Sequence, residues 1–357
     1  MDNFKITALG LMSGTSLDGL DACLATFTKT DGRWSFAIDA AREYSYPADL
    51  SRKLGTEAQQ MSAHDFVALH SEYGRFLGQR VVDFMQEFGV RPDIVASHGH
   101  TIFHEPDRRI MFQIGDGAAI AAEARVPVVS DFRRLDIMLG GQGAPLVPIG
   151  DSLLFGDYGY CLNIGGFSNI SYDDHGVRKA FDISPVNYVL NHYCRQRGLE
   201  YDRDGLIARG GTVDTRTLNA LDSLPFYAQT GAKSLGREWV EQTIFPMLNA
   251  NGLEFADLIA TFTEHAAHQV ARVTERVGKP QATMLVTGGG AFNVYLVERI
   301  AKLTGCTVET APRQIIVFKE ALIFAFLGAL HMAGEANCLS SVTGAAQDNI
   351  GGMLFKI

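Results

Sequence analysis

Apolar residues along the chain follow two rhythms. Between Ala63 and Phe88 they recur at steps of three and four residues, which predicts an amphipathic helix. Similar patterns predict further helices at Gly117–Ala124, Val186–Arg197, Gly236–Asn249, Phe255–Val277 and Val294–Leu303. Short apolar runs predict strands at Ile6–Met12, Asp21–Phe27, Ser35–Ala40, Ile94–Ser97, Val126–Ser130, Tyr160–Ile164, Ile170–Tyr172, Met284–Val286 and Thr307–Glu309. Strands that alternate with helices in this way predict an α/β fold.

Length and hydropathy set the number of domains. The chain has 357 residues, and a single core stops growing at roughly 250–300 residues, so we expect two domains. We place the first domain at 1–135, with the tail 336–357 returning to it, and the second at 136–335. The longest apolar run, Ala321–Leu330, is too short to cross ~30 Å of hydrocarbon, so it predicts a core helix and no membrane span.

Two glycine-rich segments each join a pair of predicted strands. They are SGTSLDG (Ser13–Gly19) and, about half a chain later, GGFSN (Gly165–Asn169). A third cluster, VTGGGAFN (Val286–Asn293), joins a strand to a helix. Such turns expose several backbone N–H groups on one side and let phosphate oxygens approach closely. Either hairpin alone is equally well an ordinary turn, but the matched pair together with the third cluster favours a nucleotide site.

Composition excludes several classes of function. Lys and Arg total 31 against 40 Asp and Glu, a net charge of −9, so we expect neither a nucleic-acid binder nor a membrane-surface protein. Five cysteines without a C-x-x-C spacing predict reduced, mostly buried thiols in a cytoplasmic protein. The chain lacks the GxxxxGK[ST] motif of P-loop enzymes.

Several motifs follow one another in a characteristic order. They are GLMSGTSLDGLD, SHGHTIFHEP, QIGD, DFRRLDIMLGGQGAPLVP, NIGGFSNIS, YDRDG, VTGGG and EALIFAFLG. Together they resemble the anhydro-N-acetylmuramic acid kinase family over nearly the whole chain. The resemblance implies the two-domain fold of the sugar kinase, actin and heat-shock chaperone superfamily, in which each domain is a mixed sheet with flanking helices and a cleft lies between them. We also expect a homodimer in the bacterial cytoplasm.

The resemblance also implies a reaction. Members use ATP, Mg²⁺ and water to open 1,6-anhydro-N-acetylmuramic acid, which gives N-acetylmuramic acid 6-phosphate during cell-wall recycling. The expected ATP-binding residues are Gly14, Thr15, Ser16, Leu17, Asp18, Gly19, Leu20 and Asp21, then Gly165, Gly166, Ser168 and Asn169, and finally Gly288, Gly289 and Gly290. Asp18 is also the candidate to hold hydrated Mg²⁺, although Asp before Gly equally suits a simple Asx turn.

One aspartate stands out as a candidate base. Asp182 ends a predicted strand and precedes Ser184 and Pro185, so by itself it is equally well a helix N-cap. The resemblance makes it the general base that removes a proton from the attacking water. It also makes Asn187 and Glu320 contacts of the substrate.

Polar residues near strand ends of the first half are the other sugar-contact candidates. His98 and His100 are two residues apart without a further ligand cluster, so hydrogen bonds to sugar hydroxyls or loop support are favoured over zinc. Arg133 suits the lactyl carboxylate of a muramic sugar, or else an internal ion pair with Asp131 or Asp136. Asp116 and Asp136 complete this candidate set.

Two departures from the family keep other functions open. The family commonly has D-T-G-P-G-N where this chain has FDISPVN (Phe181–Asn187), and TEHAAH (Thr263–His268) replaces a plainer run. A kinase for another sugar or amino sugar, a nucleotide-gated sugar-binding protein without catalysis, and a glycosidase without ATP are the alternatives. His265 and His268 share one helix face, as packing or surface groups do, and do not form HExxH.

Overall fold

The chain folds into two compact units. The computed structural model describes residues 4–14, 17, 19–231, 233–279 and 281–357. One unit consists of Met1–Leu154 together with Phe318–Ile357, and the other of Phe155–Val317. The boundaries therefore fall at 154/155 and 317/318, where we had placed them at 135/136 and 335/336. The difference at the first boundary arises because α5 (Val147–Leu154) packs on β3 (Arg33–Tyr44) of the first unit.

A six-stranded mixed sheet forms the centre of the first unit. Its order is β13-β7-β4-β1-β2-β3, in which β1, β4 and β7 are parallel and the other pairs are antiparallel. The remaining bounds are β1 Phe4–Ser13, β2 Leu20–Thr30, β4 Ile94–Ser97, β7 Val128–Ser130 and β13 Met353–Phe355. A separate hairpin that the hydrophobic pattern did not predict, β5 (His100–Glu105) and β6 (Ile110–Ile114), follows β4.

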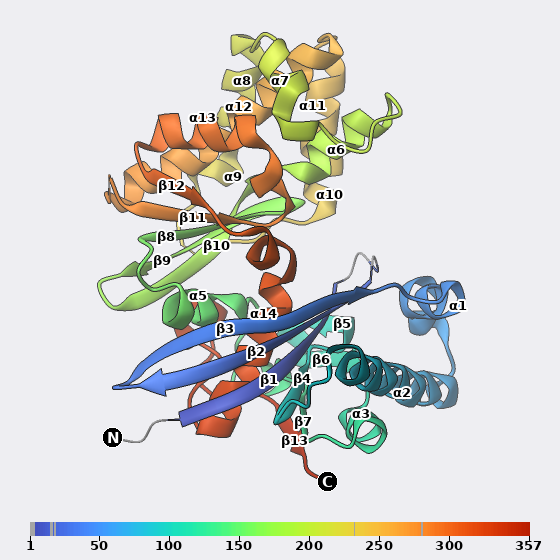
Figure 1. The fold of residues 1–357 in the computed structure, drawn as a ribbon. Helices are drawn as coiled ribbons and strands as arrows, with labels where there is room; N and C mark the ends of the chain where they lie inside the picture. The colour runs from blue at the N-terminus through green and yellow to red at the C-terminus, as the bar shows by residue number, and fades with distance from the viewer. Residues whose placement is uncertain (1–3, 15–16, 18, 232, 280) are drawn as a thin grey trace. The chain divides into compact units, whose positions relative to one another are not determined.

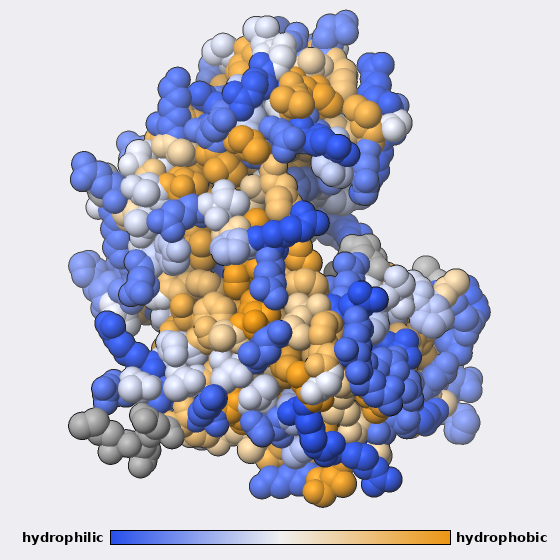
Figure 2. All heavy atoms as spheres, viewed as in Figure 1, coloured by the Kyte–Doolittle hydropathy of each residue, from blue (hydrophilic) through white to orange (hydrophobic). Residues whose placement is uncertain are grey.

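Two helices cover one face of this sheet (Figure 1). Leu9 and Leu11 of β1 point into a core with buried residues of α2 (Ala63–Phe88) and α3 (Gly117–Ala124). The start of α2 is capped by Ser62, whose side chain accepts the Asp65 N–H. The outward side of α2 is polar, and this part of the first unit is mostly blue in Figure 2.

The long apolar helix α14 (Arg313–Ala333) covers the opposite face. It approaches β1 so closely that a Cβ at Gly10 would lie 1.8 Å from the Ala321 carbonyl oxygen, so only glycine fits there. By length and composition α14 is a candidate membrane span, but 72% of its most apolar stretch is buried inside the protein. That burial is what the predicted core helix requires.

Short helices complete the first unit. They are α1 (Ala48–Arg52), the π-helix η1 (Lys53–Glu57), the 3₁₀ turns η2 (Ala58–Gln60) and η3 (Pro106–Arg108), α4 (Arg134–Met138) and α15 (Ser340–Thr343).

The second unit is built on a five-stranded mixed sheet in the order β10-β9-β8-β11-β12. Its strands are β8 Tyr160–Ile164, β9 Phe167–Asp174, β10 Val177–Pro185, β11 Thr283–Thr287 and β12 Thr307–Thr310. β8, β11 and β12 are parallel, whereas β9 is antiparallel to both of its neighbours. For β10 the sequence predicted only a strand that ends at Asp182, without a range, because charged and apolar residues alternate irregularly along it.

Helices of the second unit begin or break at identifiable residues. The predicted helix at Gly236–Asn249 is divided into α10 (Arg237–Trp239), the π-helix η5 (Val240–Ile244) and α11 (Phe245–Ala250), because Pro246 has no N–H to donate. The other helices are α6 Asn187–Arg195, α7 Leu206–Gly210, α8 Thr215–Asp222, α9 Pro225–Ala228, α12 Phe255–Val277 and α13 Val294–Thr304, with the 3₁₀ turns η4 Arg203–Gly205 and η6 Gly289–Phe292.

Many of the predicted elements are confirmed. Five of them have the same bounds in the structure, at Ala63–Phe88, Gly117–Ala124, Ile94–Ser97, Tyr160–Ile164 and Phe255–Val277. Both predicted glycine-rich hairpins join antiparallel strands, β1 to β2 and β8 to β9. All five cysteines are buried and free, as their number and spacing predicted.

Candidate functional site

Two glycine segments of the second unit meet at one edge of its sheet. β8 and β11 are parallel and in register to Asn163 and Thr287, so the Gly165–Gly166 turn and the Gly288–Gly290 loop leave the same edge. Gly288 has φ of 77°, and a Cβ there would lie 2.6 Å from the Ile164 carbonyl oxygen. A side chain at this position is excluded both by the backbone conformation and by the neighbouring turn.

The other two glycines of the Gly288–Gly290 loop differ in the space around them. A Cβ at Gly290 would lie 2.2 Å from Ile164 Cγ2, whereas Gly289 is exposed with open space beside it. Asn293 then caps α13 by accepting the Leu296 N–H at 3.0 Å. The loop therefore presents backbone at the sheet edge, as a site for a phosphate or a nucleoside requires.

The second hairpin is held against the start of α6. The Gly166 carbonyl accepts the N–H groups of Val186 (2.8 Å) and Tyr188 (3.1 Å), and the Gly165 carbonyl accepts that of Asn187 at 3.3 Å. Helix α6 therefore begins at Asn187, one residue later than predicted, and Val186 provides no side-chain cap.

The predicted phosphate donors of this hairpin differ in exposure. Gly166 and Asn169 are exposed, whereas Ser168 is buried. The Ser168 hydroxyl donates to the Ser184 carbonyl at 3.1 Å. Its predicted role as a hydroxyl donor to phosphate is therefore corrected to an internal one, which ties β9 to β10.

Asp182 lies within β10, opposite Asn169 of β9, next to a register shift between Asp182 and Ser184. Its Oδ2 accepts the Leu235 N–H at 2.9 Å, and its own N–H donates to the Lys233 carbonyl at 3.0 Å. The alternative that Asp182 caps a helix is thereby excluded. Burial raises the pKa of the Asp182 carboxyl, and the Leu235 N–H and the charge of Lys233 counteract that rise.

The segment Lys233–Leu235 is part of this site although no sequence pattern indicated it. It has no hydrophobic periodicity, and it lies more than 45 residues from the strand that it contacts. Lys233 is half-buried, and its Nζ donates to the Phe226 carbonyl at 3.3 Å and lies 4.4 Å from the Phe226 ring centroid. Desolvation lowers the pKa of Lys233 to about 8.

The first hairpin connects β1 to β2 in the first unit. The Leu17 N–H donates to the Gly14 carbonyl at 3.2 Å, and Leu17 has φ of 56°. A Cβ at Gly19 would lie 2.9 Å from the Tyr44 carbonyl oxygen, so glycine is needed for packing on β3. Three predicted residues, Thr15, Ser16 and Asp18, lie outside the described residues.

Leu20 and Asp21 belong to β2 and pair with β1 and β3. The Leu20 side chain is buried in the core, so the predicted contact of Leu20 with ATP would be made by its backbone. Asp21 is half-buried at the same end of the strand.

His98 and His100 occupy different positions from those expected on one strand. His98 follows β4, Gly99 turns the chain with φ of 70°, and His100 starts β5. His100 Nδ1 lies 3.1 Å from Ser13 Oγ, which links β5 to the first hairpin. Burial lowers the pKa of His100 to about 4, so its ring is neutral at pH 7.

His98 and Arg133 form a buried polar cluster. His98 Nδ1 lies 2.9 Å from the Gly99 carbonyl, so that nitrogen carries the proton and Nε2 is the acceptor. Two side chains contact His98 Nε2: Arg133 through Nη2 at 3.0 Å and Gln113 through Nε2 at 2.8 Å. Burial and the Arg133 charge hold the pKa of His98 well below its usual range. Gln113 was missed by the sequence reasoning.

Arg133 and Glu320 are near enough for their charges to interact. Arg133 Nη1 donates to the Gly143 carbonyl at 2.8 Å, and Asp131 contacts Arg134 instead. Desolvation lowers the pKa of Arg133 to about 10, and the charge of Glu320 counteracts it. Glu320, on α14, has an exposed side chain. The surrounding protein atoms still desolvate its carboxyl enough to raise the pKa, and the charge of Arg133 counteracts that rise.

Asp136 is a structural residue, which corrects its predicted contact with the sugar. Its side chain is fully buried. Oδ2 accepts the Gly143 N–H at 2.8 Å, and Oδ1 accepts from the Thr343 hydroxyl at 2.8 Å and the Asn349 amide at 3.0 Å. Asp136 therefore connects the loop after α4 to the C-terminal tail and offers no oxygen to a ligand.

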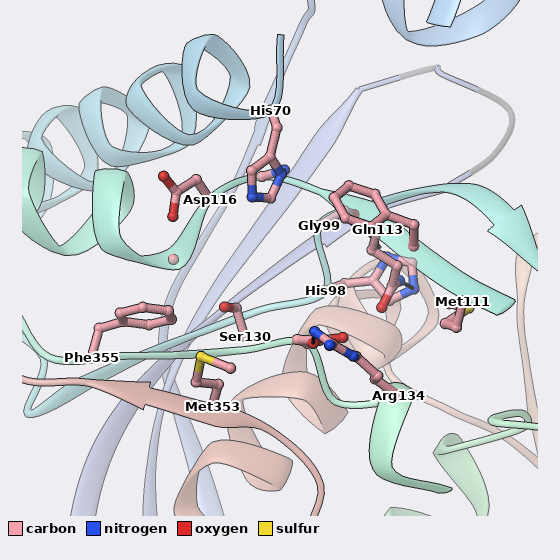
Figure 3. Close-up of a pocket in the computed structure, with 14 residues that line it drawn as sticks. His70, His98, Gly99, Met111, Gln113, Asp116, Ser130, Arg134, Met353 and Phe355 are labelled. Atoms are coloured by element: carbon pink, nitrogen blue, oxygen red, sulfur yellow. Dashed lines mark hydrogen bonds and ion pairs between the residues drawn. The ribbon is translucent and has the colours of Figure 1, made fainter. Parts of the chain in front are cut away.

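Asp116 combines a cap with a place in a cavity. Its Oδ1 accepts the Ala118 N–H at 3.0 Å, so it is the N-cap of α3. It also lines a cavity of about 150 Å³ in the first unit, which Figure 3 shows together with His98, Gln113 and Arg134. The carboxyl ends of the parallel strands β4 and β7 lead into this cavity, a position where α/β proteins commonly bind ligands.

The two units together define a class of protein. Each has a mixed sheet with a glycine-rich hairpin between antiparallel strands, and the second adds a glycine loop and a carboxylate at one sheet edge. This is an α/β protein with the backbone features of a nucleotide site.

Comparison with known proteins gives the family. The family model for anhydro-N-acetylmuramic acid kinase matches residues 6–356, and the chain belongs to that family. Relatives named anhydro-N-acetylmuramic acid kinase are 36% identical in Xanthomonas axonopodis pv. citri (97% of each chain) and 35% identical in Rhodopseudomonas palustris (98% of this chain, 99% of the relative). Another in Rhodospirillum rubrum is 34% identical (97% and 93%). The chain is therefore a kinase, and its family implies a sugar and ATP as substrates.

Solved structures give looser matches. Component A of (R)-2-hydroxyglutaryl-CoA dehydratase from Acidaminococcus fermentans superposes with a TM-score of 0.47 at 13% identity, over 92% of this chain and 100% of that one. A hexokinase from Schistosoma mansoni complexed with glucose gives a TM-score of 0.36 at 12% identity, over 90% and 85%. Scores this low support no argument about function.

Proposed function

We propose that this kinase opens 1,6-anhydro-N-acetylmuramic acid with water and transfers the γ-phosphoryl group of ATP to its 6-oxygen. The products are N-acetylmuramic acid 6-phosphate and ADP, and the reaction serves the recycling of cell-wall sugars. Family membership over residues 6–356 supports this substrate, and the position of Asp182 beside the second hairpin supports the chemistry.

The anhydro bond explains why the reaction needs a base. This sugar has no free 6-hydroxyl, because its 6-oxygen is bonded to the anomeric carbon. Water must form a bond to that carbon while the carbon's bond to the 6-oxygen breaks. The 6-oxygen then forms a bond to the γ-phosphorus, ADP leaves, and the water proton passes to a carboxylate.

Asp182 is the proposed base. Oδ2 is held by the Leu235 N–H, and among the described residues Oδ1 has no hydrogen-bond partner, so one oxygen is available for water. Removal of a proton from the attacking water typically accelerates a reaction by ~10²–10⁴-fold. The nearby negative charge also favours an oxocarbenium-like centre, as it does in glycosidases.

Backbone groups of the three glycine clusters are the proposed phosphate and nucleoside contacts. Gly166 and Gly289 are exposed, as direct contacts require. Among the described residues no three His, Cys, Asp or Glu side chains are arranged to hold a metal ion, which suits Mg²⁺ bound mainly by phosphates and water. Bound Mg²⁺ neutralises charge on the β- and γ-phosphates, and Asp18, outside the described residues, is proposed to hold it through water.

Sugar contacts are proposed in the first unit. His98 and Arg133 present a prearranged polar pair, and Arg133 carries a charge suited to the lactyl carboxylate. Glu320 is exposed near Arg133 and suits hydrogen bonds to hydroxyl groups. In the second unit Asn187, half-buried at the start of α6, is a further proposed contact.

We also propose a cytoplasmic location and a homodimer. Five buried free thiols support a reducing compartment. Burial raises the pKa of the Cys23 thiol to about 12, which leaves it unreactive. The mass of the enzyme in solution, measured by light scattering, tests the dimer.

One assay tests the proposed reaction. ADP release is measured with 1,6-anhydro-N-acetylmuramic acid, with N-acetylglucosamine and without sugar, in ¹⁸O-labelled water. We expect turnover only with the anhydro sugar, and label at the anomeric carbon of the product. Turnover with N-acetylglucosamine instead would identify a kinase of another amino sugar, the alternative that the FDISPVN sequence at the end of β10 and the start of α6 raises. Label in the phosphate would indicate uncoupled ATP hydrolysis and contradict the proposal.

A further inference from the structure

The segment Lys233–Leu235 contacts Asp182 at two points. The Lys233 carbonyl accepts the Asp182 N–H at 3.0 Å, and the Leu235 N–H donates to Asp182 Oδ2 at 2.9 Å. The first bond fixes the backbone of the aspartate and the second fixes the rotation of its carboxylate. Any shift of this segment therefore moves the carboxylate.

The Lys233 side chain anchors the segment from the other side. Its Nζ donates to the Phe226 carbonyl at 3.3 Å. The same amine lies 4.4 Å from the Phe226 ring centroid and 5.9 Å from that of Phe181, the residue before Asp182. A half-buried cation between two aromatic faces is held more firmly than one in water.

Phe226 is itself on a rigid support. It lies on α9, whose Tyr227 hydroxyl is 2.9 Å from Nε2 of the fully buried His265. His265 Nδ1 in turn lies 2.6 Å from Asp222 Oδ1. Arg276 of α12 donates to the Tyr227 carbonyl at 2.9 Å. His265, within the TEHAAH sequence of α12, thus helps to hold the element on which Lys233 is anchored.

We infer that Lys233 is a positioning residue for Asp182: its amine, anchored on Phe226, holds the segment Lys233–Leu235 against the aspartate and orients the carboxylate. This inference rests on the proposed role of Asp182 as the base. The charge of Lys233 also acts on the carboxylate, since it lowers the pKa of Asp182 against the effect of burial. The other charged group that acts on Lys233 is Arg276, which lowers the pKa of the amine.

Three lysine variants test the inference. Lys233→Met keeps most of the stem and removes the charge and the donor, whereas Lys233→Arg keeps the charge. Lys179→Met is the matched control, because Lys179 is half-buried on the same strand as Asp182 but pairs with Tyr172 at the other end of β10. For each we propose measuring kcat and KM from pH 4.5 to 9, the melting temperature, and the titration of Asp182 by NMR of ¹³Cγ-labelled aspartate in the full chain. The Asp182 signal is assigned by its loss in Asp182→Asn.

Lys233→Met is expected to lower kcat by at least about tenfold at pH 7.5, with little change in KM, because a displaced base reacts slowly while binding is retained. The acidic limb of kcat and the Asp182 titration should both move up by about 0.5–1 pH unit, because a positive charge near the carboxylate is lost. Lys233→Arg should return the limb to its wild-type position, and Lys179→Met should leave it there.

The two hypotheses fail in different ways. Suppose that Lys233→Met keeps the wild-type kcat and the wild-type Asp182 titration while Asp182→Asn is inactive. That result would overturn the inference about Lys233 and leave the proposed base in place. Near-normal turnover in Asp182→Asn would overturn the proposed base and the inference with it. If Lys233→Met folds poorly, Lys233→Arg still tests the inference. Because arginine keeps the positive charge, an acidic limb of kcat that is displaced in Lys233→Arg would contradict the role of that charge.

Discussion

Asp136 in the first unit and Asp182 in the second are both aspartates near glycine-rich turns, yet their surroundings differ. Asp136 is fully buried, and three donors from the chain occupy its two oxygens. Asp182 is half-buried and uses Oδ2 alone among the described residues. A carboxylate with both oxygens occupied stabilises the fold, whereas one with a free oxygen is able to accept a proton.

The same contrast extends to the neighbouring residues. In the first unit His98, His100 and Arg133 are engaged with each other, with Ser13 or with backbone carbonyls. In the second unit Gly166 and Gly289 leave backbone exposed at the sheet edge. Polar side chains that are already hydrogen-bonded to one another are fixed in position before a sugar binds. Exposed backbone N–H groups, in contrast, are available to bind phosphate. Substitutions on each side of this contrast therefore have different expected effects.

The largest expected effect is that of Asp182→Asn on turnover. The substitution keeps the size of the side chain and an oxygen for the Leu235 N–H but removes the base, so kcat should fall by ~10²–10⁴-fold. KM and the melting temperature should change little. Steady-state kinetics with circular dichroism measure both, and a variant with near-normal kcat would show that the water is activated elsewhere.

Asp136→Asn should act on stability and leave catalysis alone. The amide NH₂ group of asparagine is a donor and replaces one of the two carboxylate oxygens. It then faces either the Gly143 N–H or the donors of Thr343 and Asn349, and these buried donors lose their acceptor. We expect a loss of about 2–4 kcal/mol in the free energy of unfolding, seen by urea denaturation, with kcat of the folded enzyme unchanged. A stable variant with an increased KM for the sugar would restore Asp136 to the substrate site.

Gly288→Ala should weaken the use of ATP. A Cβ at φ of 77° and 2.6 Å from the Ile164 carbonyl strains the loop by about 1–3 kcal/mol, so the KM for ATP should rise by roughly tenfold. The control is Gly210→Ala at the end of α7, where a Cβ meets nothing within 4 Å. Equal KM values for ATP in the two variants would show that the Gly288–Gly290 loop does not contribute to nucleotide binding.

The smallest expected effect is that of Asp116→Ala. Loss of the N-cap of α3 should cost about 1 kcal/mol, measured as a lower midpoint of thermal unfolding. Asp116→Ser supplies another capping oxygen and should recover most of that stability. An increased KM for the sugar in both variants would show that the carboxylate also contacts the substrate, whereas a normal KM in Asp116→Ser limits Asp116 to the cap.

Strong local patterns were enough to predict much of the fold. The spacing of apolar residues predicted α2, α12 and the strands on either side of the two hairpins, because periodicity records directly which face is buried. The glycine clusters were visible for a similar reason, since a tight turn or close approach excludes side chains at the same few positions. The order of these motifs was also enough to predict the family, which the family match over residues 6–356 confirms.

Only the tertiary structure decided which polar residues are open and which are occupied. Asp136 meets Thr343 and Asn349 from the far end of the chain, and Asp182 meets Leu235 across a long connection without a pattern of its own. Whether a carboxylate is free depends on donors brought to it by folding. Those donors are backbone N–H groups and common side chains. Nothing in the sequence indicates which carboxylate such a donor will contact in the folded protein.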